Sequence, residues 1–98
     1  NTDTGVKSRY MLGECAFGQE KYNEAVGYYL EIVEGYKADD PNIKEWHARG
    51  MYEMSRCFIE LKKTEQARES LESMLKLHPD HPFAKDAKTL LAKLNTNK

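Results

Sequence analysis

The chain has 98 residues, of which 40% are hydrophobic and 32% are charged, and its net charge at pH 7 is −1. One hydrophobic core usually serves about 100 to 150 residues, so this length indicates a single small domain and argues against a two-domain enzyme. A nearly balanced charge provides no electrostatic attraction to a phosphate backbone, so we expect no nucleic acid partner. The longest stretch without a charged side chain is residues 25–30. A membrane helix needs roughly 20 mostly apolar residues, so we expect no direct membrane insertion.

Helix is the expected secondary structure throughout the chain. Leu and Ala are more frequent than Val and Ile, and apolar residues recur at spacings of three and four, as in helices with one buried face. The prolines fall only between these periodic segments, where helices end. The pattern predicts five helices, in chain order at about residues 4–17, 22–36, 41–61, 64–77 and 82–95.

The connections between these helices indicate how they pack. The third helix has the clearest start, because Asp40 is a favoured N-cap and Pro41 suits the first helical position. The connections at residues 18–21 and 62–63 are short, which makes the flanking helices antiparallel neighbours. The chain is therefore expected to form helical hairpins.

An internal repeat becomes visible when the chain is shifted against itself by 42 residues. Small residues then fall on small residues, namely Gly13 on Ser55 and Ala25 on Ala67. Small residues let two helix axes approach to the lower end of a range of roughly 8 to 10 Å. Each pair is therefore expected to mark a close contact between helices.

The large and small residues of the two copies stand at fixed offsets across each helix pair. They are Tyr10-Met11-Leu12-Gly13, Tyr22, Ala25 and Tyr29 in the first copy, and Met54, Ser55, Ala67, Leu71 and the closing Pro79 in the second. This pattern resembles the tetratricopeptide repeat. The resemblance implies an all-α, right-handed superhelix of helical hairpins, with two repeats and a C-terminal capping helix.

The resemblance also implies boundaries and a setting. It treats 1–98 as a single domain, with repeat one at about 4–37, a joint at 38–41, repeat two at about 42–79 and the capping helix at about 82–95. Residues 78–87 are similar to the Pro-x-Ser-x-x-Ala-x-x-Ala joint of bacterial envelope tetratricopeptide proteins, such as outer-membrane assembly lipoproteins and Tol-Pal-associated periplasmic proteins. This similarity implies the periplasm or cell envelope as the location and leaves the cytoplasm open.

The two cysteines occupy the same repeat position. Cys15 and Cys57 are expected on the first helices of their hairpins, about 8 to 10 Å apart, which exceeds the roughly 7 Å Cα separation that a disulfide can bridge. We expect both to be buried as small apolar residues. A disulfide or a reactive thiol is the alternative.

Metal binding and catalysis have weak support. His78 and His81, with Asp80, form a possible half of a metal site, but two imidazoles and one carboxylate do not fill a zinc shell, and His47 lies in another predicted helix. We therefore interpret residues 78–81 as a turn between helices. The sequence has no Gly-rich phosphate loop, nucleophile elbow or His-Glu-x-x-His motif, so we expect no enzyme, metal or cofactor.

The remaining candidate site is the concave face that the first helices of the hairpins form in this family. It would present eight residues, which we call the first-helix surface: Lys7, Tyr10, Glu14, Phe17, Arg49, Tyr52, Arg56 and Ile59. Tyr and Arg are over-represented among residues that dominate protein interfaces. The alternative is that Tyr10, Phe17 and Tyr52 simply pack between helices.

These observations predict a non-enzymatic protein–protein interaction module that binds a partner peptide or helix on the concave face. The family setting suggests a larger multi-repeat scaffold in a bacterial envelope or assembly complex. Acidic chaperone tails are disfavoured as partners, because Tyr10, Glu14 and Glu53 stand where the family's carboxylate clamp has Lys, Asn and Arg. Two alternatives are a homo-oligomer formed through an uncovered first helix and a regulatory appendage of a larger enzyme.

Overall fold

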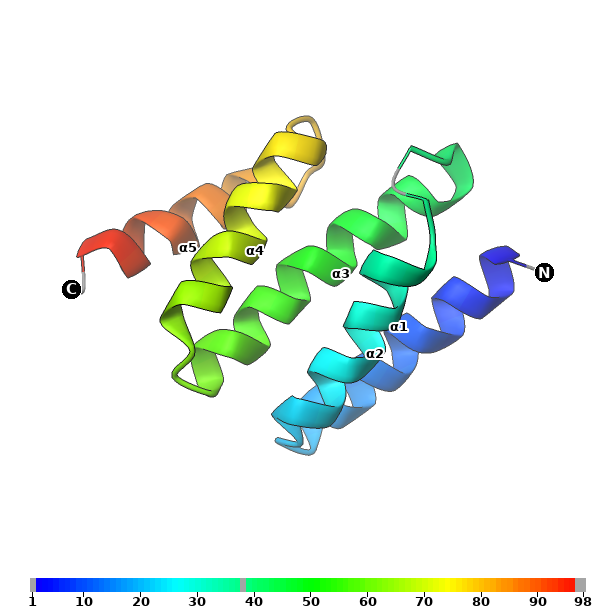
Figure 1. Cartoon of the computed structure of the whole chain (residues 1–98), viewed down its shortest axis with the longest axis horizontal. Helices are drawn as coiled ribbons and strands as arrows, with labels where there is room; N and C mark the ends of the chain where they lie inside the picture. Colours follow the sequence, from blue (N-terminus) through cyan, green and yellow to red (C-terminus); the bar gives the residue numbers. More distant parts are fainter. Residues whose placement is uncertain (1, 38, 97–98) are drawn as a thin grey trace.

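The computed structural model describes residues 2–37 and 39–96, and side chains from residue 5 onward. Within these ranges the chain forms five helices and no strand (Figure 1). Their bounds are α1 Thr2–Gly18, α2 Tyr22–Gly35, α3 Pro41–Glu60, α4 Thr64–Leu77 and α5 Ala84–Thr96. The prediction of an all-α fold built from helical hairpins is confirmed. No helix of the described residues combines the length and apolar character that crossing a membrane requires.

The two hairpins close with the same turn. Glu20 follows α1 with φ 61°, and Lys62 follows α3 with φ 63°, so both occupy the left-handed region. After each of these residues, a backbone N–H bonds back across the turn, from Lys21 to the Ala16 carbonyl at 2.9 Å and from Lys63 to the Phe58 carbonyl at 2.8 Å. These bonds occupy carbonyls that the helix ends leave free, and they reverse the chain into α2 and α4.

The start of α3 agrees with the predicted capping. Asp40 has an extended backbone, and its Oδ1 accepts a hydrogen bond of 2.9 Å from the Asn42 N–H. Pro41 is the first helical residue, where its missing N–H costs nothing.

The helices pack in chain order. The second helix packs against both α1 and α3, which also contact each other, and α4 packs against both α3 and α5. In Figure 1, α2 and α4 face the viewer, and α1 and α5 lie partly behind them. This order leaves α1 with fewer covering neighbours than α3.

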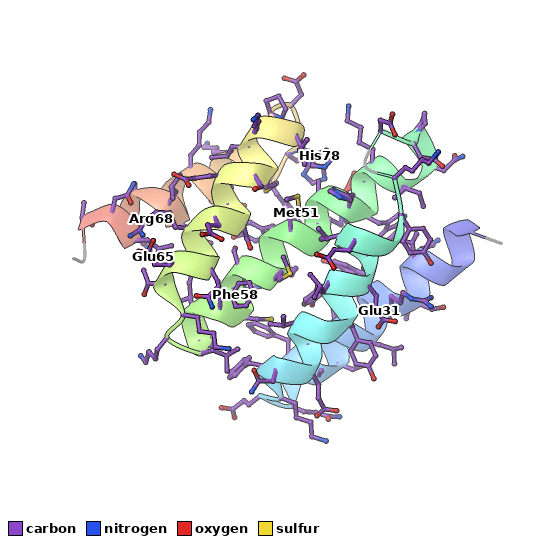
Figure 2. All side chains as sticks on the ribbon, in the orientation of Figure 1. Glu31, Met51, Phe58, Glu65, Arg68 and His78 are labelled. Atoms are coloured by element: carbon purple, nitrogen blue, oxygen red, sulfur yellow. The ribbon has the colours of Figure 1, made fainter. Side chains whose placement is uncertain are left out.

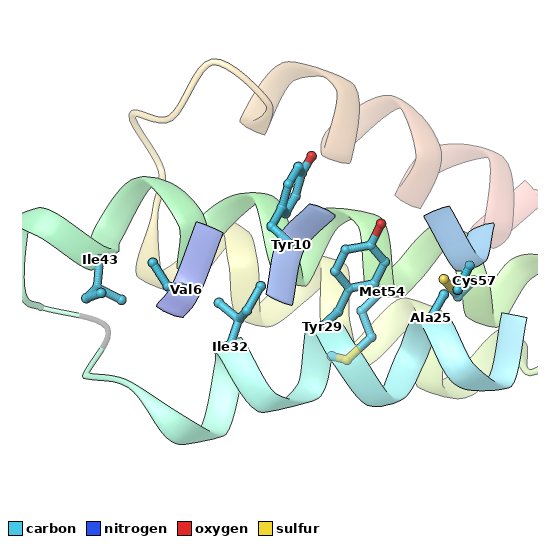
Figure 3. Packing of buried hydrophobic residues seen from close by; sticks show 9 residues of the cluster. Val6, Tyr10, Ala25, Tyr29, Ile32, Ile43, Met54 and Cys57 are labelled. Carbon is cyan, nitrogen blue, oxygen red and sulfur yellow. The ribbon is translucent and has the colours of Figure 1, made fainter. Parts of the chain in front are cut away.

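Close contact between α1 and α2 depends on a glycine. A Cβ on Gly13 would lie 2.5 Å from Cε1 of Tyr29, whose ring is 1% exposed. Around Tyr29, residues of α1, α2 and α3 form one cluster that includes Ile32 and Cys57 (Figure 3). A second cluster, around Leu71, joins α3, α4 and α5. The molecule therefore has one cluster on each side of α3.

Two helix starts and the burial of Cys15 differ from the predictions, and four residues lie outside the described part of the chain. The capping helix begins at Ala84 rather than at about 82, because residues 81–84 form a turn in which the Ala84 N–H donates to the His81 carbonyl at 2.9 Å. The first helix begins at Thr2, earlier than predicted. Both cysteines are free thiols, but Cys15 is exposed and only Cys57 is buried, because among the described residues no helix covers the Cys15 side of α1. Residue 38 of the predicted joint, and residues 1, 97 and 98, are outside the described residues.

Candidate binding surface

The first-helix surface is built from two helices that lie side by side. Spacings of three and four residues place its α1 members on one face of that helix, and the same spacings align its α3 members. The Tyr10 hydroxyl donates to Oε2 of Glu53 at 3.3 Å, and the Arg56 guanidinium lies 4.7 Å from the ring centroid of Phe17. These contacts connect α1 to α3 across the surface.

Tyr10 is the most buried member of the surface. It is 4% exposed, and its ring centroid lies 5.8 Å from that of Tyr29 and 5.4 Å from that of Trp46. Burial is the main cause of the raised pKa of its hydroxyl, and the nearby Glu53 carboxylate raises it further. Tyr10 therefore acts mainly in packing, as the alternative interpretation proposed, and offers little area to a partner.

Arg49 lies in a group of aromatic rings. Its guanidinium carbon is 5.2 Å from the Trp46 ring centroid, 5.6 Å from that of Phe83 and 5.9 Å from that of Tyr10. Its Nε donates to Oε1 of Glu45 at 2.7 Å. Cation–π contacts and the ion pair hold this side chain in one orientation while leaving it partly exposed.

Arg56 is held in a similar way at the other end of α3. Its Nη1 donates to Oε1 of Glu53 at 2.7 Å while its guanidinium covers Phe17. Beside it lies a hollow of about 130 Å³. The hollow is lined by Glu14, Phe17, Gly18, Tyr29, Glu53 and Arg56. Three residues of the first-helix surface, one of them the exposed Glu14, therefore converge on one concavity.

The other three members lie further from this hollow. Lys7 is exposed, with its Nζ 5.8 Å from the Trp46 ring centroid. Tyr52 is partly exposed, and its ring centroid is 5.0 Å from that of Phe83, just before α5. Ile59 lies partly exposed near the end of α3 and is not part of these contacts.

Comparison with known proteins identifies the repeat. A family model described as tetratricopeptide repeat matches residues 7–37 and 49–81, and the two matches begin 42 residues apart. The chain belongs to the tetratricopeptide repeat family. Tetratricopeptide repeats generally mediate protein–protein interactions, and domains of this kind are typically non-enzymatic. No curated protein and no solved structure matches the chain.

The sequence analysis missed three residues that contact Arg49 of the first-helix surface. Trp46 and Phe83 supply rings around Arg49, and Glu45 accepts hydrogen bonds from both Arg49 and His81. Burial alone would raise the pKa of Glu45, but the hydrogen bonds from His81 and Arg49 outweigh it and lower that pKa. Trp46 stands three residues before Arg49 on the same helical face, and this spacing could have revealed it. Phe83 is far from Arg49 in the sequence, and only the folded chain brings the two side chains together.

His47 lies in a different helix from the turn at residues 78–81, as predicted, but the fold brings its ring to that turn. Nδ1 of His47 is 2.9 Å from Nε2 of His78. Within residues 2–37 and 39–96, no group of three or more His, Cys, Asp or Glu side chains is placed to hold a metal ion.

Proposed function

We propose that the chain binds a peptide segment or helix of a partner protein on the concave first-helix surface. The observation that carries this proposal is the hollow beside Arg56, where an arginine fixed by Phe17 and Glu53 borders a concavity. An arginine already held in place loses little conformational freedom on binding, which favours its use as an interface anchor. The hollow has room for a partner side chain.

The charges around the hollow indicate the kind of partner. Arg56 is paired with Glu53, and Glu14 adds an exposed carboxylate at the rim. A strongly acidic tail would meet both carboxylates, so it would be repelled. A segment of mixed charge that offers an apolar side chain to the hollow fits this arrangement better.

Selection from a displayed peptide library against the intact chain tests the proposal. Peptides that bind the wild type should lose at least about tenfold in affinity for Arg56→Glu, because the substitution removes the anchor and places three carboxylates around the hollow. Lys76→Glu is the matched control, since it makes the same charge change on an exposed position of α4. Equal affinities for wild type and Arg56→Glu would refute this site.

The wider setting is part of the proposal. Similarity of residues 78–87 to the joint of bacterial envelope tetratricopeptide proteins supports a place within a multi-repeat scaffold of the envelope. Fractionation of cells that produce the full-length protein tests this setting. Recovery in the periplasm or membrane fraction is expected, and recovery only in the cytoplasm would contradict it.

Self-association through α1 is the second candidate. Met11 is 63% exposed and Leu12 is 46% exposed, and the exposed Cys15 lies one turn further along the helix. A second copy could cover this outer side of α1 without using the first-helix surface. Sedimentation of wild type and Leu12→Glu separates the candidates, because a dimer that Leu12→Glu abolishes supports self-association and a monomer at millimolar concentration excludes it.

A further inference from the structure

Two buried histidines meet within the second hairpin, on the side that faces α2. His47 comes from the first half of α3, His78 caps the end of α4, and each is 2% exposed. Figure 2 shows His78 between the end of α4 and the neighbouring helices. Nδ1 of His47 and Nε2 of His78 are 2.9 Å apart, and Nε2 of His47 is 3.1 Å from the carbonyl oxygen of Val33 in α2. The contact between the two histidines therefore joins α3 to the end of α4, and the contact with Val33 joins α3 to α2 across the repeat boundary.

The chemistry of the three groups determines where the protons lie. The Val33 carbonyl can only accept, so Nε2 of His47 must carry the hydrogen. In a neutral ring Nδ1 of His47 is then an acceptor, and Nε2 of His78 must donate to it. Neutral His78 is left with an unprotonated Nδ1, which is buried and has no hydrogen-bond partner.

The surroundings of the pair do not favour a positive charge. From α3, Lys44 faces His78, and from the following turn His81 does so, and both disfavour its protonation. From α2, the group that meets His47 is the uncharged carbonyl of Val33. Among the charged residues that line the pocket of about 340 Å³ next to His78, Glu45 is bonded to Arg49 and His81 rather than to the pair. Asp80 lines the same pocket. The pocket gives water a route to this part of the boundary.

We propose that His47 and His78 form an acid-sensitive latch, which ties α3 to the end of α4 and, through Val33, to α2 when both rings are neutral, and which loosens this junction when the rings take up protons. When one proton is added and His47 becomes the cation, both of its ring nitrogens donate hydrogen bonds. Nε2 of His78 must then accept, so the hydrogen of the His78 ring moves to Nδ1, which has no partner. A second proton gives two adjacent buried cations. Both protonated states bury positive charge without a compensating partner, so both destabilise the packed junction around the two rings.

The direction of the pH effect follows from the two pKa values. Burial is the main cause that lowers the pKa of His78 from 6.5 to about 4, and burial also lowers the pKa of His47. The unfolded chain therefore binds more protons below pH 6.5, so stability is greatest above this pH and falls as the pH approaches 4. For His78 alone, the unfolding equilibrium constant should rise by about 20-fold between pH 7 and pH 5.

Urea unfolding of the wild-type chain at pH 7 and pH 5 tests the proposal. The His78→Gln variant keeps a donor to His47 but cannot titrate. The rise of its unfolding equilibrium constant between pH 7 and pH 5 should therefore be at least fivefold smaller than in the wild type. His81→Gln, which removes a histidine outside the pair, should respond like the wild type. Equal stability of the wild type at both pH values, or a response abolished by His81→Gln rather than His78→Gln, would overturn the latch.

An NMR measurement on the wild type tests the latch without any variant. Long-range proton–nitrogen spectra should show both rings protonated at Nε2 at pH 7, with amide exchange around Val33 and Met74 accelerating as the two rings titrate. Rings protonated at Nδ1, or titration near pH 6.5 without faster exchange at these amides, would contradict the latch.

Discussion

The first helices of the two hairpins carry corresponding side chains in different surroundings. Leu12 and Cys15 of α1 align with Met54 and Cys57 of α3. Leu12 is 46% exposed and Cys15 is exposed, whereas Met54 is 7% exposed and Cys57 is fully buried. Among the described residues, α3 has α2 on one side and α4 on the other, whereas no helix packs on the outer side of α1, so the neighbours decide which repeat positions are buried.

This contrast distinguishes two sides of α1. One side joins α3 in the first-helix surface, and the other exposes Met11, Leu12 and Cys15. An apolar helical stripe therefore indicates a side suited to packing, but whether it is core or contact surface depends on which helix is adjacent.

The largest expected effect compares Met54→Ala with Leu12→Ala. Removing the buried Met54 side chain leaves a cavity between helices and should cost about 2–5 kcal/mol of unfolding free energy. The exposed Leu12 should cost less than about 0.5 kcal/mol. Urea unfolding followed by circular dichroism measures both. Equal losses would mean that another copy covers α1 in solution.

A smaller effect separates the buried Gly13 from the exposed Gly27. Gly13→Ala places a Cβ against the buried ring of Tyr29 and should destabilise the chain by about 1–3 kcal/mol despite the better helix propensity of Ala. Gly27→Ala is the control, since nothing lies within 4 Å of its Cβ, and it should stabilise by about 0.5–1 kcal/mol. A stabilising Gly13→Ala would contradict the close approach of α1 and α2.

The smallest effect concerns the cysteines. Cys57→Ser buries a hydroxyl and should cost about 1–2 kcal/mol, whereas Cys15→Ser should change stability by less than about 0.5 kcal/mol. Burial is the main cause that raises the pKa of the Cys57 thiol to about 12, so a thiol reagent at pH 8 should label Cys15 first. Mass spectrometry of partly labelled protein identifies the modified residue, and labelling of Cys57 first would contradict its burial.

Helix positions were predictable where a local signal marks them. Asp40 and Pro41 start α3 through a hydrogen bond and a backbone preference that need only adjacent residues. The short connections predicted the hairpins, but the left-handed turn residues Glu20 and Lys62 are not glycines, so nothing in their side chains revealed this conformation. Both hairpins have the same turn, which indicates that the packing of the joined helices imposes the left-handed conformation.

Contacts between residues far apart in the sequence were less predictable. His47 and His78 are separated by 31 positions, and their meeting depends on how α3 packs against the end of α4. Cys15 was expected to be buried because its repeat position suits a core, but a repeat pattern does not say which copy has a neighbour. Periodicity predicted which residues share one face of each first helix. The burial of Tyr10 became clear only from the structure, where its ring packs against that of Trp46.

The most direct test of the binding proposal follows backbone amide shifts while a library-selected peptide is added to the chain. The account predicts the largest shifts around the hollow, at Glu14, Phe17 and Arg56, with small shifts on the exposed side of α4. Largest shifts at Met11, Leu12 and Cys15, with those around the hollow unchanged, would show that the partner binds the outer side of α1 and would contradict the account.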